Sequence, residues 1–129
     1  PGEARVVRAG ADATIESWSS QVQSCEQRCD ELAAQGIAAE LIDLRSIWPW
    51  DRATVLGSCA RTRHLLVVHE AVQGGGSGAE TAATVAETVG SKVQRLGAPR
   101  IPVGYAPVLE AQSRVSASDI AAAARGLLA

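Results

Sequence analysis

The sequence predicts an α/β fold in which a mostly parallel β-sheet is covered by helices on both faces. Short runs of apolar and β-branched residues alternate along the chain with longer segments of helical periodicity. The connections between these segments are short, which favours parallel strands joined by crossover helices. The run HLLVVH (64–69) is apolar throughout between its two histidines, as expected of a strand buried on both faces.

Five segments are predicted to be strands, because each is short and rich in apolar or β-branched residues. Too few residues separate the first two segments for a crossover helix to fit between them. The first strand is therefore expected to run antiparallel to the others. The predicted strands are residues 3–9, 13–18, 38–44, 64–69 and 92–96.

A first helix is predicted between the second and third strands. Ser20 followed by Gln23 fits a capping box at its start, and Gly36 supplies a left-handed residue at its end. An apolar stripe at helical spacing should face the sheet. The stripe consists of Val22, Cys25, Cys29 and Leu32.

Two further helices follow the third and fourth strands. Asp51 is predicted to be the N-cap of one, with Trp50 before it packing on Val55 as a hydrophobic staple. The other is expected to run from about residue 78 to residue 89 and to stop at Gly90. Both connect consecutive strands, as crossover helices do.

The last helix is predicted to begin after Ser116, which forms a capping box with Asp119. Before it, the proline-rich segment 98–107 is expected to cross the surface without regular structure. The apolar face of the helix should pack on the sheet. That face consists of Ile120, Ala123, Ala124, Leu127 and Leu128.

Length and composition indicate one globular domain, residues 1–129, with 47% apolar residues and a net charge of −2. The charges are well mixed, so neither nucleic acid nor a membrane surface is an expected partner. No apolar run approaches the roughly 18 residues that cross a bilayer, and no signal peptide is visible. The three cysteines are therefore expected to be free thiols in a reducing cytoplasm. The absence of methionine indicates a piece of a longer protein.

The stretch HEAVQGGGSGAE (69–80) contains residue types that are common in active sites. A zinc protease would require H-E-x-x-H on one helix, but Gln73 stands where the second histidine belongs. With His64 and His69 as the only histidines, no metal site is expected. Cys25 and Cys29 lie on the apolar stripe, so a core role is expected for them.

The glycines of this stretch formally match a dinucleotide-binding fingerprint at Gly74, Gly76 and Ala79. The match starts several residues beyond the strand, and no acid ends a following strand where a ribose would need one. The Gly-Lys-Ser/Thr sequence of a triphosphate loop is missing too. Ser77 and Glu80 are instead predicted to form a capping box, a structural role that is favoured over catalysis. Ser77 also lacks the context of a nucleophile elbow.

Five motifs occur in order along the chain: AGADATIESWSS (9–20), GIAAELIDLRSIWPWDRATVL (36–56), RTRHLLVVHEAV (61–72), GSGAE (76–80) and IPVGYAPVLE (101–110). Together they resemble the C-terminal domain of the transketolase family. The similarity is strongest to the β subunits of the thiamine-diphosphate-dependent decarboxylating components of 2-oxo acid dehydrogenase complexes. It covers almost the whole chain, and the motif that joins LIDLRS to PWD is specific.

The resemblance implies a three-layer α/β/α fold with a five-stranded mixed sheet, in the order 1-3-2-4-5, whose first strand is antiparallel. It also implies a parent enzyme that oxidatively decarboxylates a 2-oxo acid on thiamine diphosphate and Mg²⁺ and transfers the acyl group to a lipoyl group. In that family the cofactor lies between two other domains, and the catalytic glutamate belongs to one of them. No catalytic, cofactor-binding or metal-binding residue is therefore expected in this chain, and the isolated domain should be inactive.

The partners implied by the resemblance are the rest of the β subunit, the α subunit and the dihydrolipoamide acyltransferase core, in a dimer or heterotetramer. In relatives the end of this domain lies beside the docking module of the acyltransferase core, whose surface is basic. Leu128 and Ala129, with the terminal carboxylate, are therefore expected to contribute to docking. An acid that usually precedes an Ala-Pro pair near this contact is missing here.

Two positions depart from the family pattern: Ser19 stands where a glycine usually ends the second strand, and Ser77 where an aromatic or aliphatic residue is usual. Two alternatives to the β-subunit hypothesis remain open. One is the equivalent domain of transketolase or of deoxyxylulose-phosphate synthase. The other is a stand-alone α/β module that binds a small ligand with the glycine turn at the carboxyl edge of the sheet.

Overall fold

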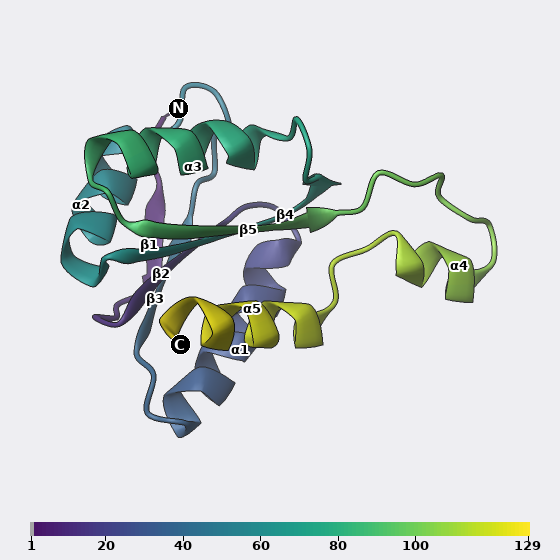
Figure 1. Cartoon of the computed structure of the whole chain (residues 1–129), viewed down its shortest axis with the longest axis horizontal. Coiled ribbons are helices and arrows are strands. Elements are labelled where there is room, and N and C mark those ends of the chain that lie inside the picture. Colours follow the sequence, from purple (N-terminus) through teal and green to yellow (C-terminus); the bar gives the residue numbers. More distant parts are fainter. Residues whose placement is uncertain (1) are drawn as a thin grey trace.

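In the computed structural model, which describes residues 2–129, the chain forms a five-stranded sheet between two layers of helices (Figure 1). Pro1, the first residue of the predicted domain, lies outside the described residues. The strand order is β1-β3-β2-β4-β5. β1 runs antiparallel to β3, whereas the β2–β3, β2–β4 and β4–β5 pairings are parallel. The predicted three-layer fold, strand order and antiparallel first strand are confirmed.

All five predicted strands are present, although two of them are longer than expected. β4 continues beyond the predicted end at residue 69, and β5 continues beyond residue 96. Both extensions run alongside each other after an irregularity in the register between Val68 and Val72. The strands are β1 (Arg5–Arg8), β2 (Ala13–Ser17), β3 (Ala39–Asp43), β4 (His64–Val72) and β5 (Lys92–Ala98).

Two helices cover each face of the sheet: α1 and α5 lie on one face, and α2 and α3 on the other (Figure 1). A fifth helix, α4, stands away from the sheet and was not predicted. It spans six residues and buries none of them, so it carries no apolar stripe that a sequence pattern could reveal. The helices are α1 (Gln21–Ala34), α2 (Arg52–Thr62), α3 (Ser77–Thr88), α4 (Pro107–Gln112) and α5 (Ala117–Leu128).

The central strand β4 supplies core residues to both faces of the sheet. Leu66 and Val68 pack in the cluster beneath α1 and α5, whereas Leu65 and Val67 pack beneath α2 and α3. The apolar run that predicted a doubly buried strand is thereby accounted for. No helix within residues 2–129 is long and apolar enough to cross a membrane.

Two of the predicted helix caps are confirmed. The Asp51 carboxylate accepts a hydrogen bond from the Thr54 amide at 3.1 Å, as an N-cap does, and also accepts one from the Ala4 amide at 3.0 Å. Hydrogen bonds from the Ala4 amide first, and then from the hydroxyl and amide of Thr54, hold the pKa of Asp51 below its usual value. Ser116 and Asp119 form the complete capping box that was predicted for α5.

The predicted capping box at Ser20 and Gln23 is wrong. Ser20 precedes α1 but already has a helical conformation, whereas a capping residue is usually extended. Its hydroxyl donates instead to the Glu70 carboxylate, 2.8 Å away at the end of β4. The preceding residue, Ser19, turns the chain with a φ of +57°. That left-handed conformation explains why a glycine is usual at this position in the family that the sequence resembles.

Candidate functional site

The stretch 69–80 folds around the imidazole of His69, which is fully buried. A Cβ atom built on Gly76, Gly78 or Gly97 would lie only 2.9, 2.6 or 2.8 Å from atoms of this ring. Glycine is therefore required at these positions because the histidine fills the space that a side chain would need. The glycine turn is packed against protein, which disfavours the hypothesis that it cradles a small ligand or a phosphate.

His69 is held as a neutral base inside the domain. Its Nδ1 lies 3.0 Å from the carbonyl oxygen of Ala71, so Nδ1 carries the proton and donates it. Nε2 then bears a lone pair, and it has no hydrogen-bond partner among the described residues. Burial lowers the pKa of His69 below its ordinary value. The ring stacks on Trp18, with 5.2 Å between the ring centroids.

The predicted capping box at Ser77 and Glu80 is also wrong, because α3 begins one residue earlier than that box requires. Gly76 is the N-cap, in an extended conformation, and no side chain caps the helix. A Cβ at Gly76 would lie 2.5 Å from the carbonyl oxygen of Val72, so only glycine can occupy the cap position. Ser77 is therefore the first residue of the helix, where its hydroxyl cannot play the predicted role.

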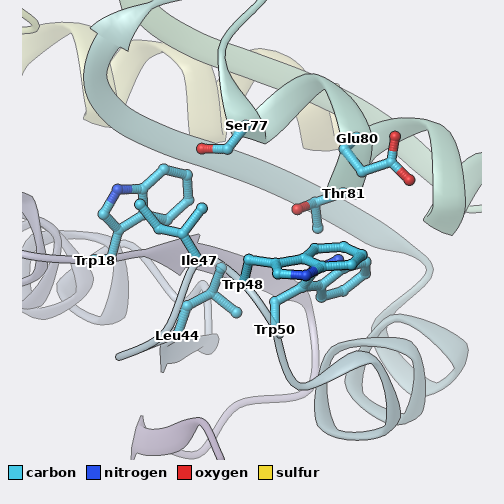
Figure 2. Close-up of a pocket in the computed structure, with 8 residues that line it drawn as sticks. All are labelled: Trp18, Leu44, Ile47, Trp48, Trp50, Ser77, Glu80 and Thr81. Atoms are coloured by element: carbon cyan, nitrogen blue, oxygen red, sulfur yellow. The ribbon is translucent and has the colours of Figure 1, made fainter. Parts of the chain in front are cut away.

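Ser77 and Glu80 instead line a cavity of about 240 Å³, which we name the tryptophan pocket. One wall is the first turn of α3, and the other is the loop that follows β3. In Figure 2 the helix side chains and the loop side chains lie on opposite sides of the cavity. Trp48, in the loop, is 81% exposed. The lining residues are Trp18, Leu44, Ile47, Trp48, Trp50, Ser77, Glu80 and Thr81.

This pocket was not predicted from the sequence, although one signal was available. The chain has only three tryptophans, and all of them line the pocket. They follow the carboxyl ends of β2 and β3, the edge of a parallel sheet at which ligands usually bind. Trp48 precedes Pro49 through a cis peptide bond. The walls consist mainly of apolar side chains, with the hydroxyls of Ser77 and Thr81 and the Glu80 carboxylate as polar groups.

Glu16, on β2, is a fully buried carboxyl group close to this pocket. Neither of its oxygens has a hydrogen bond of ordinary geometry within the described residues. Burial raises the pKa of Glu16 to about 8, and the Thr81 hydroxyl, which also lines the pocket, opposes that shift. Glu16 is therefore mostly protonated at neutral pH, and the floor of this face of the sheet is uncharged.

The cysteines belong to the core, as predicted for Cys25 and Cys29. Cys25, Cys29 and Cys59 are all buried and free. Burial raises the pKa of Cys25 to about 12 and that of Cys29 to about 11, so neither thiol forms a thiolate at neutral pH. Within residues 2–129 no group of three or more His, Cys, Asp or Glu side chains could hold a metal ion.

The predicted docking residues lie at the end of α5, on the face of the sheet opposite the tryptophan pocket. Leu127 is buried against the sheet, Leu128 is half-buried and Ala129 is exposed. The Lys92 ammonium, at the start of β5, lies 3.4 Å from the carbonyl oxygen of Ala129. Leu128 and Ala129 thus lie at the surface near Lys92, and neither residue lines the tryptophan pocket.

A model of the domain family described as "Transketolase, C-terminal domain" matches residues 2–120. The chain is 37% identical over 96% of its length to pyruvate dehydrogenase E1 component subunit beta-2 of Oryza sativa subsp. japonica, of which it covers 34%. It is 46% identical over 66% of its length to 2-oxoisovalerate dehydrogenase subunit beta 2 of Arabidopsis thaliana, of which it covers 24%. The chain thus spans about a quarter to a third of these relatives.

Among solved structures, a split gene transketolase described as an inactive beta4 tetramer superposes with a TM-score of 0.91 at 27% identity. The match covers 99% of this chain and 43% of that one. A 2-oxoglutarate:ferredoxin oxidoreductase from Magnetococcus marinus superposes with a TM-score of 0.65 at 15% identity, covering 98% of this chain and 19% of that one, which shows a shared fold alone. The fold and the family model therefore agree.

The buried carboxyl group of Glu16 predicts a specific pH dependence of stability. Folding raises the pKa of Glu16 from 4.5 to about 8, so between these values the folded state holds a proton that the unfolded state has released. The contribution of Glu16 to stability should therefore be greatest below about pH 4.5, fall as the pH rises, and be lost above about pH 8. The neutral Glu16→Gln variant should lack this component. Urea unfolding of both proteins from pH 5 to 9 measures it, and parallel curves would contradict the prediction.

Proposed function

Because the chain belongs to the transketolase C-terminal domain family, we propose that it is the assembly and docking domain of the β subunit of a 2-oxo acid dehydrogenase component. The observation that carries this proposal is 35–37% identity over 92% or more of the chain to seven β subunits of pyruvate dehydrogenase and acetoin-oxidising enzymes. The transketolase alternative has support from the solved tetramer, but at a lower identity of 27%.

The parent enzyme would decarboxylate a 2-oxo acid on thiamine diphosphate with Mg²⁺ and pass the acyl group to a lipoyl group. The described residues of this domain do not fit that cofactor. Holding its diphosphate requires a magnesium site, and residues 2–129 contain no cluster of metal-binding side chains. The tryptophan pocket has no basic side chain to face a diphosphate, and it offers a carboxylate, Glu80, instead. The cofactor would therefore be held by other parts of the parent.

Assembly is the role that the surface of the domain supports. In the parent, the partners would be the rest of the β subunit, the α subunit and the dihydrolipoamide acyltransferase core. The related split transketolase is a tetramer of one kind of chain by its description, so contact between two copies of this domain is also proposed. Exposed apolar side chains such as Trp48 and Tyr105 are the kind of surface that subunit contacts cover.

For docking, we propose that Leu128 and Ala129 contact the acyltransferase core. Leu127 anchors the last turn of α5 in the core of the domain, so the two residues after it are held at a fixed place on the surface. Lys92 contacts the carbonyl oxygen of Ala129 from within the chain, which shows that a cation can reach this position. A basic partner surface would add further cationic donors around the same carbonyl oxygen.

The isolated chain should not bind thiamine diphosphate, since the described residues contain no metal site and the pocket is apolar. Calorimetric titration of the 129-residue chain with thiamine diphosphate and Mg²⁺ should give only heats of dilution. The complete enzyme, reconstituted from both subunits, is the positive control. A saturable micromolar isotherm with the isolated chain would overturn the assignment of the cofactor to other domains.

Deleting Leu128 and Ala129 from the full-length β subunit should weaken docking to the acyltransferase core roughly tenfold at low salt, the value of one charge-assisted hydrogen bond. The loss should shrink at high salt, because exposed charges are screened. Decarboxylation by the reconstituted enzyme should be unchanged. Surface plasmon resonance against the docking module at two salt concentrations measures the effect.

The matched control is Ala122→Ser, a neutral change at an exposed position of the same helix. It should bind like the wild type at both salt concentrations. If the truncated subunit also binds like the wild type, Leu128 and Ala129 have no part in docking.

A further inference from the structure

The tryptophan pocket combines aromatic rings with a single negative charge. All three tryptophans of the chain line it, and Glu80 is the one charged side chain among the described residues of its walls. Figure 2 shows the Glu80 carboxylate at the end of the pocket where the indoles of Trp48 and Trp50 lie, with Trp18 at the other end. The pocket therefore presents aromatic faces and a carboxylate to a ligand.

The charge of Glu80 is not neutralised within the described part of the domain. None of the ion pairs formed within residues 2–129 includes Glu80, which is exposed on the first turn of α3. An apolar occupant would take water away from this carboxylate and leave it unpaired, which is unfavourable. An anionic occupant would be repelled. Only a positively charged occupant gains from the carboxylate and from the apolar walls together.

The tryptophans favour an organic cation over a metal ion. The face of an indole ring attracts cations, and quaternary ammonium groups are commonly recognised in this way. Within the domain, the Arg52 guanidinium already lies over the ring of Trp50, 5.7 Å from its centroid. Arg52 does not line the pocket, and Trp48 is 81% exposed, so one indole stays accessible beside Glu80. A hard metal ion would instead need several oxygen ligands, and residues 2–129 hold no such cluster.

The shape of the pocket limits the size of the cation. Its volume of about 240 Å³ lies below the roughly 300–1,000 Å³ of pockets that hold drug-sized ligands. The first turn of α3 and the loop after β3 enclose it from two sides (Figure 2), whereas contacts between proteins bury larger surfaces. A compact head group fits this space, and the hydroxyls of Ser77 and Thr81 can bond to a polar group attached to it.

We infer that the tryptophan pocket binds a small quaternary ammonium compound, whose cationic head group lies against Trp48 and beside the Glu80 carboxylate. Three other cavities formed by the described residues lack this chemistry, because each has an arginine and no aromatic side chain in its wall. The inference goes beyond the proposed function, since it concerns a ligand of the domain and not its assembly.

Choline is the probe for this site, and neohexyl alcohol, in which carbon replaces the charged nitrogen, is the matched control ligand. All three tryptophans line the pocket, so every indole N–H signal in the NMR spectrum of the 129-residue chain reports on it. Choline should shift these signals saturably. Neohexyl alcohol should bind at least roughly fivefold more weakly, because it has the same shape without the charge that the indoles and the carboxylate attract.

Two variants separate the contributions of the charge and of the ring. Glu80→Gln should weaken choline binding roughly threefold and leave the affinity for neohexyl alcohol unchanged. Trp48→Leu should weaken choline binding at least roughly fivefold. Trp48 is 81% exposed, so this variant should keep the wild-type melting temperature. Glu87→Gln, at an exposed position of the same helix, is the matched control and should bind choline like the wild type.

The parent enzyme provides a second test, because subunit contacts there could cover the pocket. Equilibrium dialysis of radiolabelled choline against enzyme reconstituted from both subunits should reveal a site on the β subunit that Glu80→Gln and Trp48→Leu weaken. If choline binds the 129-residue chain but not the enzyme, the parent itself occupies the pocket and the inference is wrong.

The absence of a saturable shift with choline would overturn the inference. Equal affinities for choline and neohexyl alcohol would also overturn it, because the pocket would then be an apolar site that does not recognise charge. So would equal choline binding by Glu80→Gln and Glu87→Gln. None of these results bears on docking by Leu128 and Ala129, which lie on the opposite face of the sheet.

Discussion

The packing of the His69 ring among three glycines is the constraint on which the arrangement of the carboxyl edge of the sheet depends. The ring ends the buried part of β4, touches Gly97 on β5 and lies against Gly76 and Gly78 at the start of α3. It also stacks on Trp18, which follows β2. One side chain therefore fixes the relative positions of three strands and one helix. Because the space beside α3 is occupied, the helix can begin only at a glycine cap.

The position of α3 in turn sets the chemistry of the surface above it. Starting the helix after Gly76 turns Ser77, Glu80 and Thr81 toward the loop that follows β3, which closes the tryptophan pocket. Beneath this wall the ionisable groups are uncharged at neutral pH: burial lowers the pKa of His69 and raises that of Glu16. Uncharged polar groups are less costly to bury than ions, so the sheet can carry both residues inside.

The sequence predicted what depends on local periodicity and missed what depends on contacts between distant residues. The apolar run of β4 and the short link before β2 were enough to predict a buried central strand and an antiparallel first strand. The caps at Asp51 and Ser116 were predictable because donor and acceptor are three residues apart.

The capping box predicted at Ser20 failed, because the Ser20 hydroxyl pairs with Glu70, fifty residues along the chain. The capping box at Ser77 failed because His69 moves the start of the helix. The tryptophan pocket joins three separate segments, and no local pattern describes it.

His69 dictates glycine at position 78, because its ring fills the space that a side chain there would occupy. A double-mutant cycle measures that claim directly. Gly78→Ala should destabilise the wild type by about 1–3 kcal/mol, the usual cost of overpacking. In a His69→Ala background the cost of the same change should be smaller by at least about 1 kcal/mol, since the two closest contacts, both with the ring, are gone. Gly126→Ala, which meets nothing within 4 Å, should not destabilise either protein. If the effects of Gly78→Ala and His69→Ala are simply additive, the histidine does not determine the glycine turn.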